Sequence, residues 1–221
     1  MYCDVCGQEF LVRHSCPGPI PTGDTVAPPE GFALFHYLRE AWRIVCWDEA
    51  AIRRVMDDPK ALRYGMLFWV IGITVPSLIF DFFGPMKRNA PLGSSYLLRL
   101  TAATVFGIGF RLLQVGIIHL VAKHFCAGDG KFIQVARPLS LVSLILLLEA
   151  LPAVIGMFFG DISWATLGIA GYLLGNIAWV TVMVMVFDVV DGMDQLTAFI
   201  TSIASVFGLR LLFEFISKQR F

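Results

Sequence analysis

Long runs of uncharged, apolar residues constrain the fold of this chain more than any other feature. The longest run, residues 162–187, holds 26 consecutive residues without a charged side chain. About 20 residues in an α-helix cross a hydrocarbon core of about 30 Å. Backbone groups in lipid must bond within their own segment, so such a run predicts a helix. With 57% hydrophobic residues, the sequence indicates an all-α integral membrane protein.

Five such runs predict a polytopic transmembrane domain over residues 61–221. The fourth run is the clearest, whereas the second is interrupted by Arg99, Arg111 and His119. Its longest uncharged stretch is short enough for a re-entrant segment, but four spans would leave much apolar sequence without a place. The predicted spans are approximately residues 64–83, 96–122, 139–159, 162–187 and 195–217.

Two segments of different character precede the spans. Residues 19–31 are rich in proline and predict an extended linker. Residues 32–60 alternate apolar and charged side chains at three- and four-residue steps, which predicts an amphipathic helix. Such a helix can lie in the cytoplasmic interface with Trp42 and Trp47 at head-group depth. It can equally pack against the spans.

The first 18 residues, "MYCDVCGQEFLVRHSCPG", resemble a small metal-binding head. Cys3, Cys6, His14 and Cys16 offer three thiolates and one imidazole, which are enough for a closed tetrahedral zinc site. So short a segment cannot bury a core, and a structural Zn²⁺ would supply its folding free energy. The alternatives are a redox pair at Cys3 and Cys6, or unrelated motifs.

Basic residues in the short flanks predict the orientation of the spans. Nine of them fall on the N-terminal side and five on the other. The nine are Arg39, Arg43, Arg53, Arg54, Lys60, Arg63, Lys123, Lys131 and Arg137, and the five are Lys87, Arg88, Arg99, Lys218 and Arg220. We therefore expect a cytoplasmic N-terminus and, after five spans, an external C-terminus. Reduced cysteines in the head favour the same side.

The order of these segments resembles a known family. An N-terminal soluble part, an interfacial helix, five closely spaced spans, the loop "HLVAKHFCAGDGKFIQVARPLS" and the following "LEALP" are similar to the bacterial branch of the Yip (Ypt-interacting-protein) family. The resemblance covers residues 40–217 and excludes the head. It implies a multi-pass protein of the cell inner membrane without catalytic residues, which acts as a scaffold or binds protein partners.

Several polar side chains fall inside the predicted spans, where charge is costly. Counting along the spans places Arg111 and Glu149 at the same depth, so we expect them to meet. Arg210 should reach Glu149 or pair with Glu214, one helical turn on. Such a cluster can stabilise the bundle or form a pathway for a solute or ion. Its members are Arg111, Glu149, Asn176, Arg210 and Glu214.

Small residues and a cluster of aspartates complete the pattern. Two stripes of small residues predict close helix packing, within the chain or between copies. They are Ala102, Gly109 and Gly116, and Gly168, Gly171, Gly175 and Ala178. The segment "DVVDGMDQ" predicts a solvated turn at Asp188 and Asp191, with Asp194 capping the fifth span.

These features favour a membrane scaffold whose cytoplasmic head binds a protein partner. The competing prediction is a transporter of a small solute or ion that uses the intramembrane cluster. No sequence motif of an enzyme is present, so catalysis is not expected. The 17 basic and 17 acidic residues balance, which gives no overall attraction to nucleic acid.

Overall fold

The apolar segments fold into five helical spans. In this computed structural model, which describes residues 33–83, 94–126, 128–159 and 163–218, every regular element of the described chain is a helix. Five helical segments are long and apolar enough to cross a membrane, as predicted. Three are uninterrupted: α3 (Ala61–Phe83), α4 (Ser94–Phe125) and α7 (Trp164–Asp191). The protein is therefore a multi-pass helical membrane protein.

The third span changes its helical type along its length. It begins as α5 (Phe132–Val142), continues as the 3-10 helix η2 (Ser143–Ala150) and ends as α6 (Leu151–Phe159). Pro152 has no backbone N–H and so cannot donate to the carbonyl of Leu148. That carbonyl instead accepts the N–H of Leu151, in the tighter 3-10 pattern.

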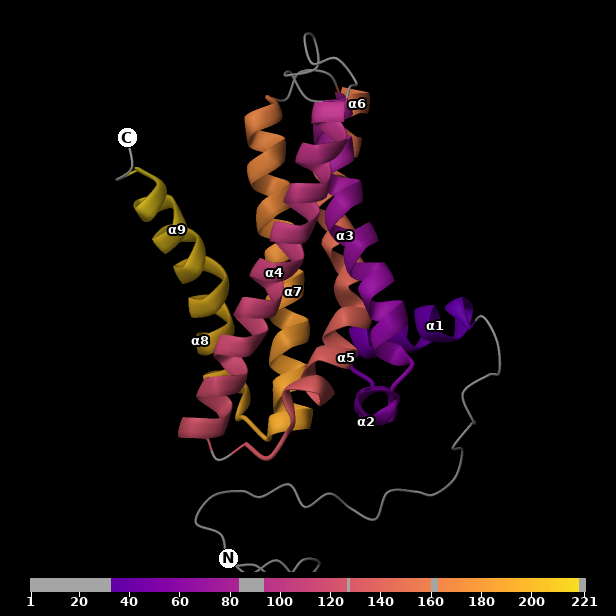
Figure 1. The fold of residues 1–221 in the computed structure, drawn as a ribbon, viewed down its shortest axis with the longest axis vertical. Helices are drawn as coiled ribbons and strands as arrows, with labels where there is room; N and C mark the ends of the chain where they lie inside the picture. The colour runs from indigo at the N-terminus through magenta and orange to yellow at the C-terminus, as the bar shows by residue number, and fades with distance from the viewer. Residues whose placement is uncertain (1–32, 84–93, 127, 160–162, 219–221) are drawn as a thin grey trace, which may run out of the picture. The chain divides into compact units, whose positions relative to one another are not determined.

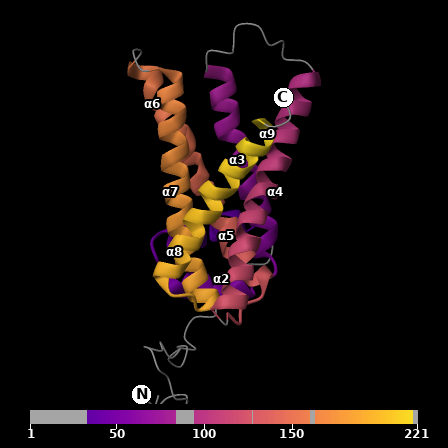
Figure 2. The same ribbon diagram turned by 90° about the vertical axis from the view of Figure 1, so that its left-hand side faces the viewer.

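The fifth span is also irregular. It consists of α8 (Gln195–Ile203), a π-helical turn η3 (Ala204–Gly208) and α9 (Leu209–Lys218). Asp194 accepts a hydrogen bond from the backbone N–H of Thr197 at 3.0 Å, so the predicted N-cap is confirmed. Hydrogen bonds from the side chain and from the backbone N–H of Thr197 lower the pKa of the Asp194 carboxyl. From α8 to α9 the span runs obliquely across the other helices (Figure 2).

The core of the bundle lies where α3 and α7 pack on the third span (Figure 1). The indole rings of Trp69 on α3 and Trp179 on α7 are fully buried, as is the ring of Phe187. The α8 segment packs on α7, and α4 contacts α3 and α5. The ends of α4, α7 and α2 thus lie at one end of the bundle, together with the start of α5 (Figure 1).

The amphipathic segment is two helices, whereas the sequence analysis predicted a single helix over residues 32–60. Helix α1 (Leu34–Val45) is followed by α2 (Glu49–Asp57). The break falls at Trp47, whose φ of 67° is left-handed, and Asp48 then caps α2 by accepting from the N–H of Ala51. The periodicity of the apolar residues continues through the break, which explains why the sequence did not predict the break.

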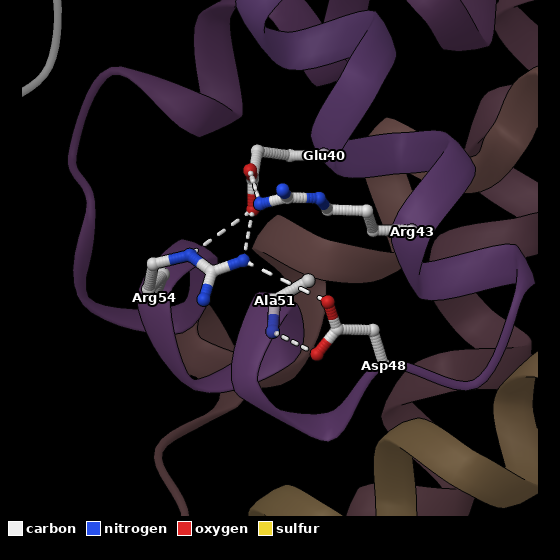
Figure 3. Close-up of polar contacts among 5 residues, drawn as sticks. All are labelled: Glu40, Arg43, Asp48, Ala51 and Arg54. Carbon is white, nitrogen blue, oxygen red and sulfur yellow. Dashed lines mark hydrogen bonds and ion pairs between the residues drawn. The ribbon is translucent and has the colours of Figure 1, made fainter. Parts of the chain in front are cut away.

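Ion pairs and hydrogen bonds hold the two short helices together (Figure 3). The buried Glu40 of α1 accepts hydrogen bonds from Arg43 at 3.2 Å and from Arg54 of α2 at 3.0 Å. Tyr37 donates a hydrogen bond of 2.6 Å to Asp58. Burial and this hydrogen bond raise the pKa of the Tyr37 phenol above its usual range. Location in the membrane interface stays a prediction for this segment, whose Phe35, Trp42 and Trp47 are exposed.

Only one of the two predicted small-residue stripes brings helices together within the described chain. A Cβ added to Gly171 of α7 would lie 2.0 Å from the carbonyl oxygen of Glu149, so the absence of a side chain lets η2 approach. In contrast, a Cβ at Gly109 of α4 would have no described atom within 4 Å. The prediction of close packing within the chain is therefore wrong for Gly109, because this face of α4 is turned outward.

Candidate functional site

A buried arginine forms the centre of the polar cluster inside the bundle. Arg111, halfway along α4, donates to Glu149 of η2 at 3.2 Å and to Asn176 of α7 at 3.0 Å. It also donates to Gln114 at 3.1 Å. Its guanidinium carbon lies 5.5 Å from the centroid of the Trp179 ring, within range of a cation–π interaction. The predicted contact between Arg111 and Glu149 is confirmed.

Two glycines of α7 allow Glu149 to reach this position. A Cβ at Gly175 would lie 2.1 Å from the Glu149 Cγ, and one at Gly171 would meet the Glu149 backbone. Any larger residue would push η2 away from α7. Asn176, the next residue of α7, donates to the carbonyl of Tyr172 at 2.7 Å, which orients its amide oxygen toward Arg111. The small residues and the polar cluster thus form one structural unit.

Arg210 of α9 approaches the cluster from another direction. Its guanidinium carbon lies 3.9 Å from the centroid of the Tyr172 ring, a short cation–π distance. The side chain is exposed on the surface of the protein and lines the same pocket as Glu149. Glu214, the fifth predicted member of the cluster, has a side chain outside the described residues.

A pocket of about 590 Å³ opens beside the cluster. Its walls come from α3, α4, η2, α7 and α9, and its size is that of a small-molecule site. Both polar and apolar side chains line it. The polar lining residues are Ser77, Arg111, Glu149, Tyr172, Asn176 and Arg210, and the large apolar ones are Ile73, Phe80, Phe106, Phe110 and Leu146.

The structure also contains a buried pair that the sequence analysis missed. His119 of α4 lies 3.0 Å from Asp191 at the end of α7, measured from Nδ1 to Oδ2. Both residues are buried, Asp191 with only 3% of its surface exposed. The interpretation of Asp191 as a solvated turn residue is therefore wrong. Nothing in the local sequence indicated this, because the two residues are 72 positions apart.

The chain around Gly130 covers this pair. A Cβ added to Gly130 would lie 2.2 Å from the Asp191 carboxylate and 2.9 Å from the carbonyl of Val190. The ring of Phe132 packs edge-on against His119, with centroids 5.8 Å apart. By contrast, Asp188 is only partly buried and accepts a hydrogen bond from Gln195 at 3.0 Å. The pair thus joins α4, α7 and the start of α5.

The predicted zinc ligands Cys3, Cys6, His14 and Cys16 lie outside the described residues, so the structural zinc head stays a prediction. Within the part of the chain that the structure describes, no three His, Cys, Asp or Glu side chains come close enough to hold a metal ion. This includes the aspartates at the start of the fifth span.

Comparison of the chain with family models, with curated proteins and with solved structures finds no match in any of the three.

Proposed function

We propose that this protein binds a small ligand within its membrane domain, in the pocket beside Arg111 and Glu149. The observation that carries the proposal is the pocket itself. Its volume of about 590 Å³ suits a small molecule, and three charged side chains line it among helices long enough to span a membrane. Charged residues within spans are rare and generally mark ligand or ion sites.

The helix types around the pocket support this proposal. Glu149 lies near the end of the 3-10 helix η2, and Arg210 follows the π-helical turn η3 by two residues. Departures from α-helical geometry are frequent at functional sites, and interrupted helices carry the substrate sites of many membrane transporters. One of the three charged residues of the pocket therefore lies on an irregular segment, and a second lies two residues beyond one.

The three charged residues have different roles in this proposal. Arg111 is held by Glu149, Asn176 and Gln114, so it positions Glu149 and fixes the wall of the pocket. Glu149 retains a quarter of its side-chain surface exposed and can meet a ligand. Arg210 closes the site from α9. The competing prediction from the sequence is transport of the ligand. Transport would require the ligand to bind at this site during its passage across the membrane.

Native mass spectrometry of the full chain, released from nanodiscs made with cell membrane lipids, tests the proposal. We expect a bound small molecule on the wild type and its loss in Ala103→Trp, because Ala103 lines the pocket and an indole there would fill it. Arg99→Gln is the matched control, since Arg99 is exposed on the same helix outside the pocket. Equal retention by Ala103→Trp, with its helical content unchanged, would exclude this pocket as the site.

The scaffold role and the Yip-type resemblance stay predictions. Both depend on the layout of the chain, and the partner-binding role depends on the Cys/His head at residues 1–18, which lies outside the described residues. A partner bound through the head is compatible with a ligand in the membrane domain, because the two would use different parts of the chain.

A further inference from the structure

Helix α1 packs on the bundle with one face and leaves the opposite face uncovered by the described chain. It contacts α5, α2 and α3, and its buried residues are Tyr37, Glu40, Ala41 and Ile44. Phe35 and Trp42 are seven residues apart, so they lie on one side of the helix, with 84% and 68% of their surface exposed. The sequence left open whether this segment packs on the spans or lies in the membrane interface. Because the two faces are separate, both arrangements can hold together.

A contact with the first span gives the depth of α1. Tyr37 of α1 stacks on Tyr64 of α3, with ring centroids 4.4 Å apart. Tyr64 comes three residues after the start of the first span at Ala61, about 4.5 Å along the helix. Met66 and Leu67, within one helical turn of Tyr64, are exposed on the outside of α3. Helix α1, which Figure 1 shows beside the lower part of α3, therefore lies where the apolar outer surface of the bundle begins.

The turn between α1 and α2 places a tryptophan where glycine is usual. The backbone N–H of Trp47 donates to the carbonyl of Ile44 at 3.0 Å, and that of the next residue donates to the carbonyl of Arg43 at the same distance. These two bonds form a Schellman motif, with Trp47 at the position that glycine most often occupies. Its φ of 67° is open to glycine but strained for a residue with a Cβ. Trp47 has 52% of its surface exposed, so packing within the described chain does not offset this strain fully.

The chemistry of the uncovered face matches the boundary between lipid head groups and hydrocarbon. Tryptophan is enriched at this boundary, because its ring is apolar and its N–H is polar. Arg39 is exposed between Phe35 and Trp42, and its charge would oppose burial in the hydrocarbon core. At the boundary, the apolar part of an arginine side chain can lie along the lipid while the guanidinium reaches the head groups.

We propose that Phe35, Trp42 and Trp47 insert into the lipid–water interface and anchor α1 and α2 there. In this proposal, the strained conformation of Trp47 is retained because it presents the indole to the lipid. Helix α2 is bonded to α5 through Gln134 and Arg137, so the anchor also holds the start of the third span at the membrane surface. The proposal does not depend on a ligand in the pocket.

Fluorescence quenching of the full chain in phosphatidylcholine nanodiscs tests this proposal. The difference in emission between the wild type and Trp47→Phe reports the indole of Trp47, and Trp42→Phe reports that of Trp42 in the same way. Nitroxide labels sit on the lipid head group, high on the acyl chain or at its end, and iodide quenches from the water. We expect the two upper labels to quench both indoles at least about twofold more than the label at the chain end.

Trp179→Phe is the control, because the Trp179 indole is fully buried in the bundle. Its emission should be quenched least by iodide and by the head-group label. For Trp42 and Trp47, strongest quenching from the chain end would place the indoles in the hydrocarbon core, and quenching by iodide alone would place them in water. No quenching at all would mean that protein covers this face, from another copy or a partner. Each of these three results would overturn the proposal.

Two further substitutions test the role of the strain. Trp47→Gly and Trp47→Ala both remove the indole, but only glycine relieves the left-handed conformation. We expect Trp47→Gly to melt about 2–4 °C above Trp47→Ala in the same detergent, and both variants to lose the emission that the upper labels quench. Equal melting temperatures would overturn the assignment of strain to Trp47.

Discussion

Arg111 is buried among oxygen atoms that accept its hydrogen bonds, so its charge has partners inside the bundle. Loss of one partner would leave the other charge uncompensated. We expect Arg111→Leu or Glu149→Leu alone to lower the free energy of unfolding by about 3–5 kcal/mol. The double variant should recover much of that loss, because an isolated buried charge is more costly than two apolar side chains. Thermal unfolding in detergent gives the coupling free energy.

A matched pair on the surface calibrates this double-mutant cycle. Arg53 and Glu49 of α2 lie 3.9 Å apart and are exposed, so the same substitutions there should change the unfolding free energy by less than about 1 kcal/mol. Additive losses at Arg111 and Glu149 would show that their contact does not couple them.

The buried pair of His119 and Asp191 leads to a second prediction. Asp191→Ala would leave the imidazole of His119 without its acceptor, at an expected loss of about 1–3 kcal/mol in unfolding free energy. Asp188→Ala is the control, since this residue is three positions away and only partly buried, and it should lose little. Chemical denaturation of both variants measures the difference. An equal effect would mean that burial of Asp191 contributes nothing.

At the level of helices, the sequence predicted the number of spans and where most of them lie. Apolar length sets both, and the observed α3, α4 and α7 agree with the predicted segments to within a few residues. It did not predict the break at Trp47 or the changes of helical type in the third and fifth spans. Those depend on local backbone bonding, which the apolar periodicity does not record.

From the sequence, only those contacts of the candidate site that follow from the depth of residues along the spans could be predicted. Arg111 and Glu149 share a depth in adjacent spans, and a simple count of residues found their contact. The stacking of Arg210 on Tyr172 and the pair of His119 and Asp191 depend on how the helices are rotated about their axes. Rotation follows from packing against neighbours, which a single sequence does not specify.

Close approach of η2 to α7 gives a third prediction. Gly171→Ala would place a methyl group 2.0 Å from the carbonyl oxygen of Glu149, and overpacking of this kind costs about 1–3 kcal/mol. Gly109→Ala should instead be neutral or stabilising by up to about 1 kcal/mol, because its position is open and alanine favours the helix. Melting temperatures of the two variants compare them directly. A tolerated Gly171→Ala would argue against the tight packing of Glu149.

At the scale of the whole molecule, the two basic segments assigned to the cytoplasm lie at the same end of the bundle. Gln134 of α5 donates to Asp57 of α2 at 3.1 Å, and Arg137 donates to the carbonyl of Met56 at 2.6 Å. We therefore expect both segments on one side of the membrane and, with five spans, the two chain ends on opposite sides. Fusions to reporters that are active on only one side test this. The same signal from both ends would remove one span from the topology.

The predicted head is tested by its metal content. We expect the purified full chain to carry about one zinc ion, and Cys6→Ser or Cys16→Ser to lose it without lowering the melting temperature of the membrane domain. Cys126→Ser is the control, because this thiol lies at the end of α4 outside the head. Elemental analysis after purification without chelators measures the zinc. A metal-free wild type would refute the assignment.

The 3-10 segment within the third span sets the rotation and the axial position of the residues that follow it in the span. A 3-10 helix turns about 120° per residue and rises about 2.0 Å, against about 100° and 1.5 Å in an α-helix. Over the eight residues of η2, the difference amounts to about 160° of rotation and about 4 Å of length. A transition of η2 to α-helix would therefore rotate α6 about its axis by nearly half a turn and shift it along that axis. The same rotation would move Glu149 away from Arg111 and out of the wall of the pocket.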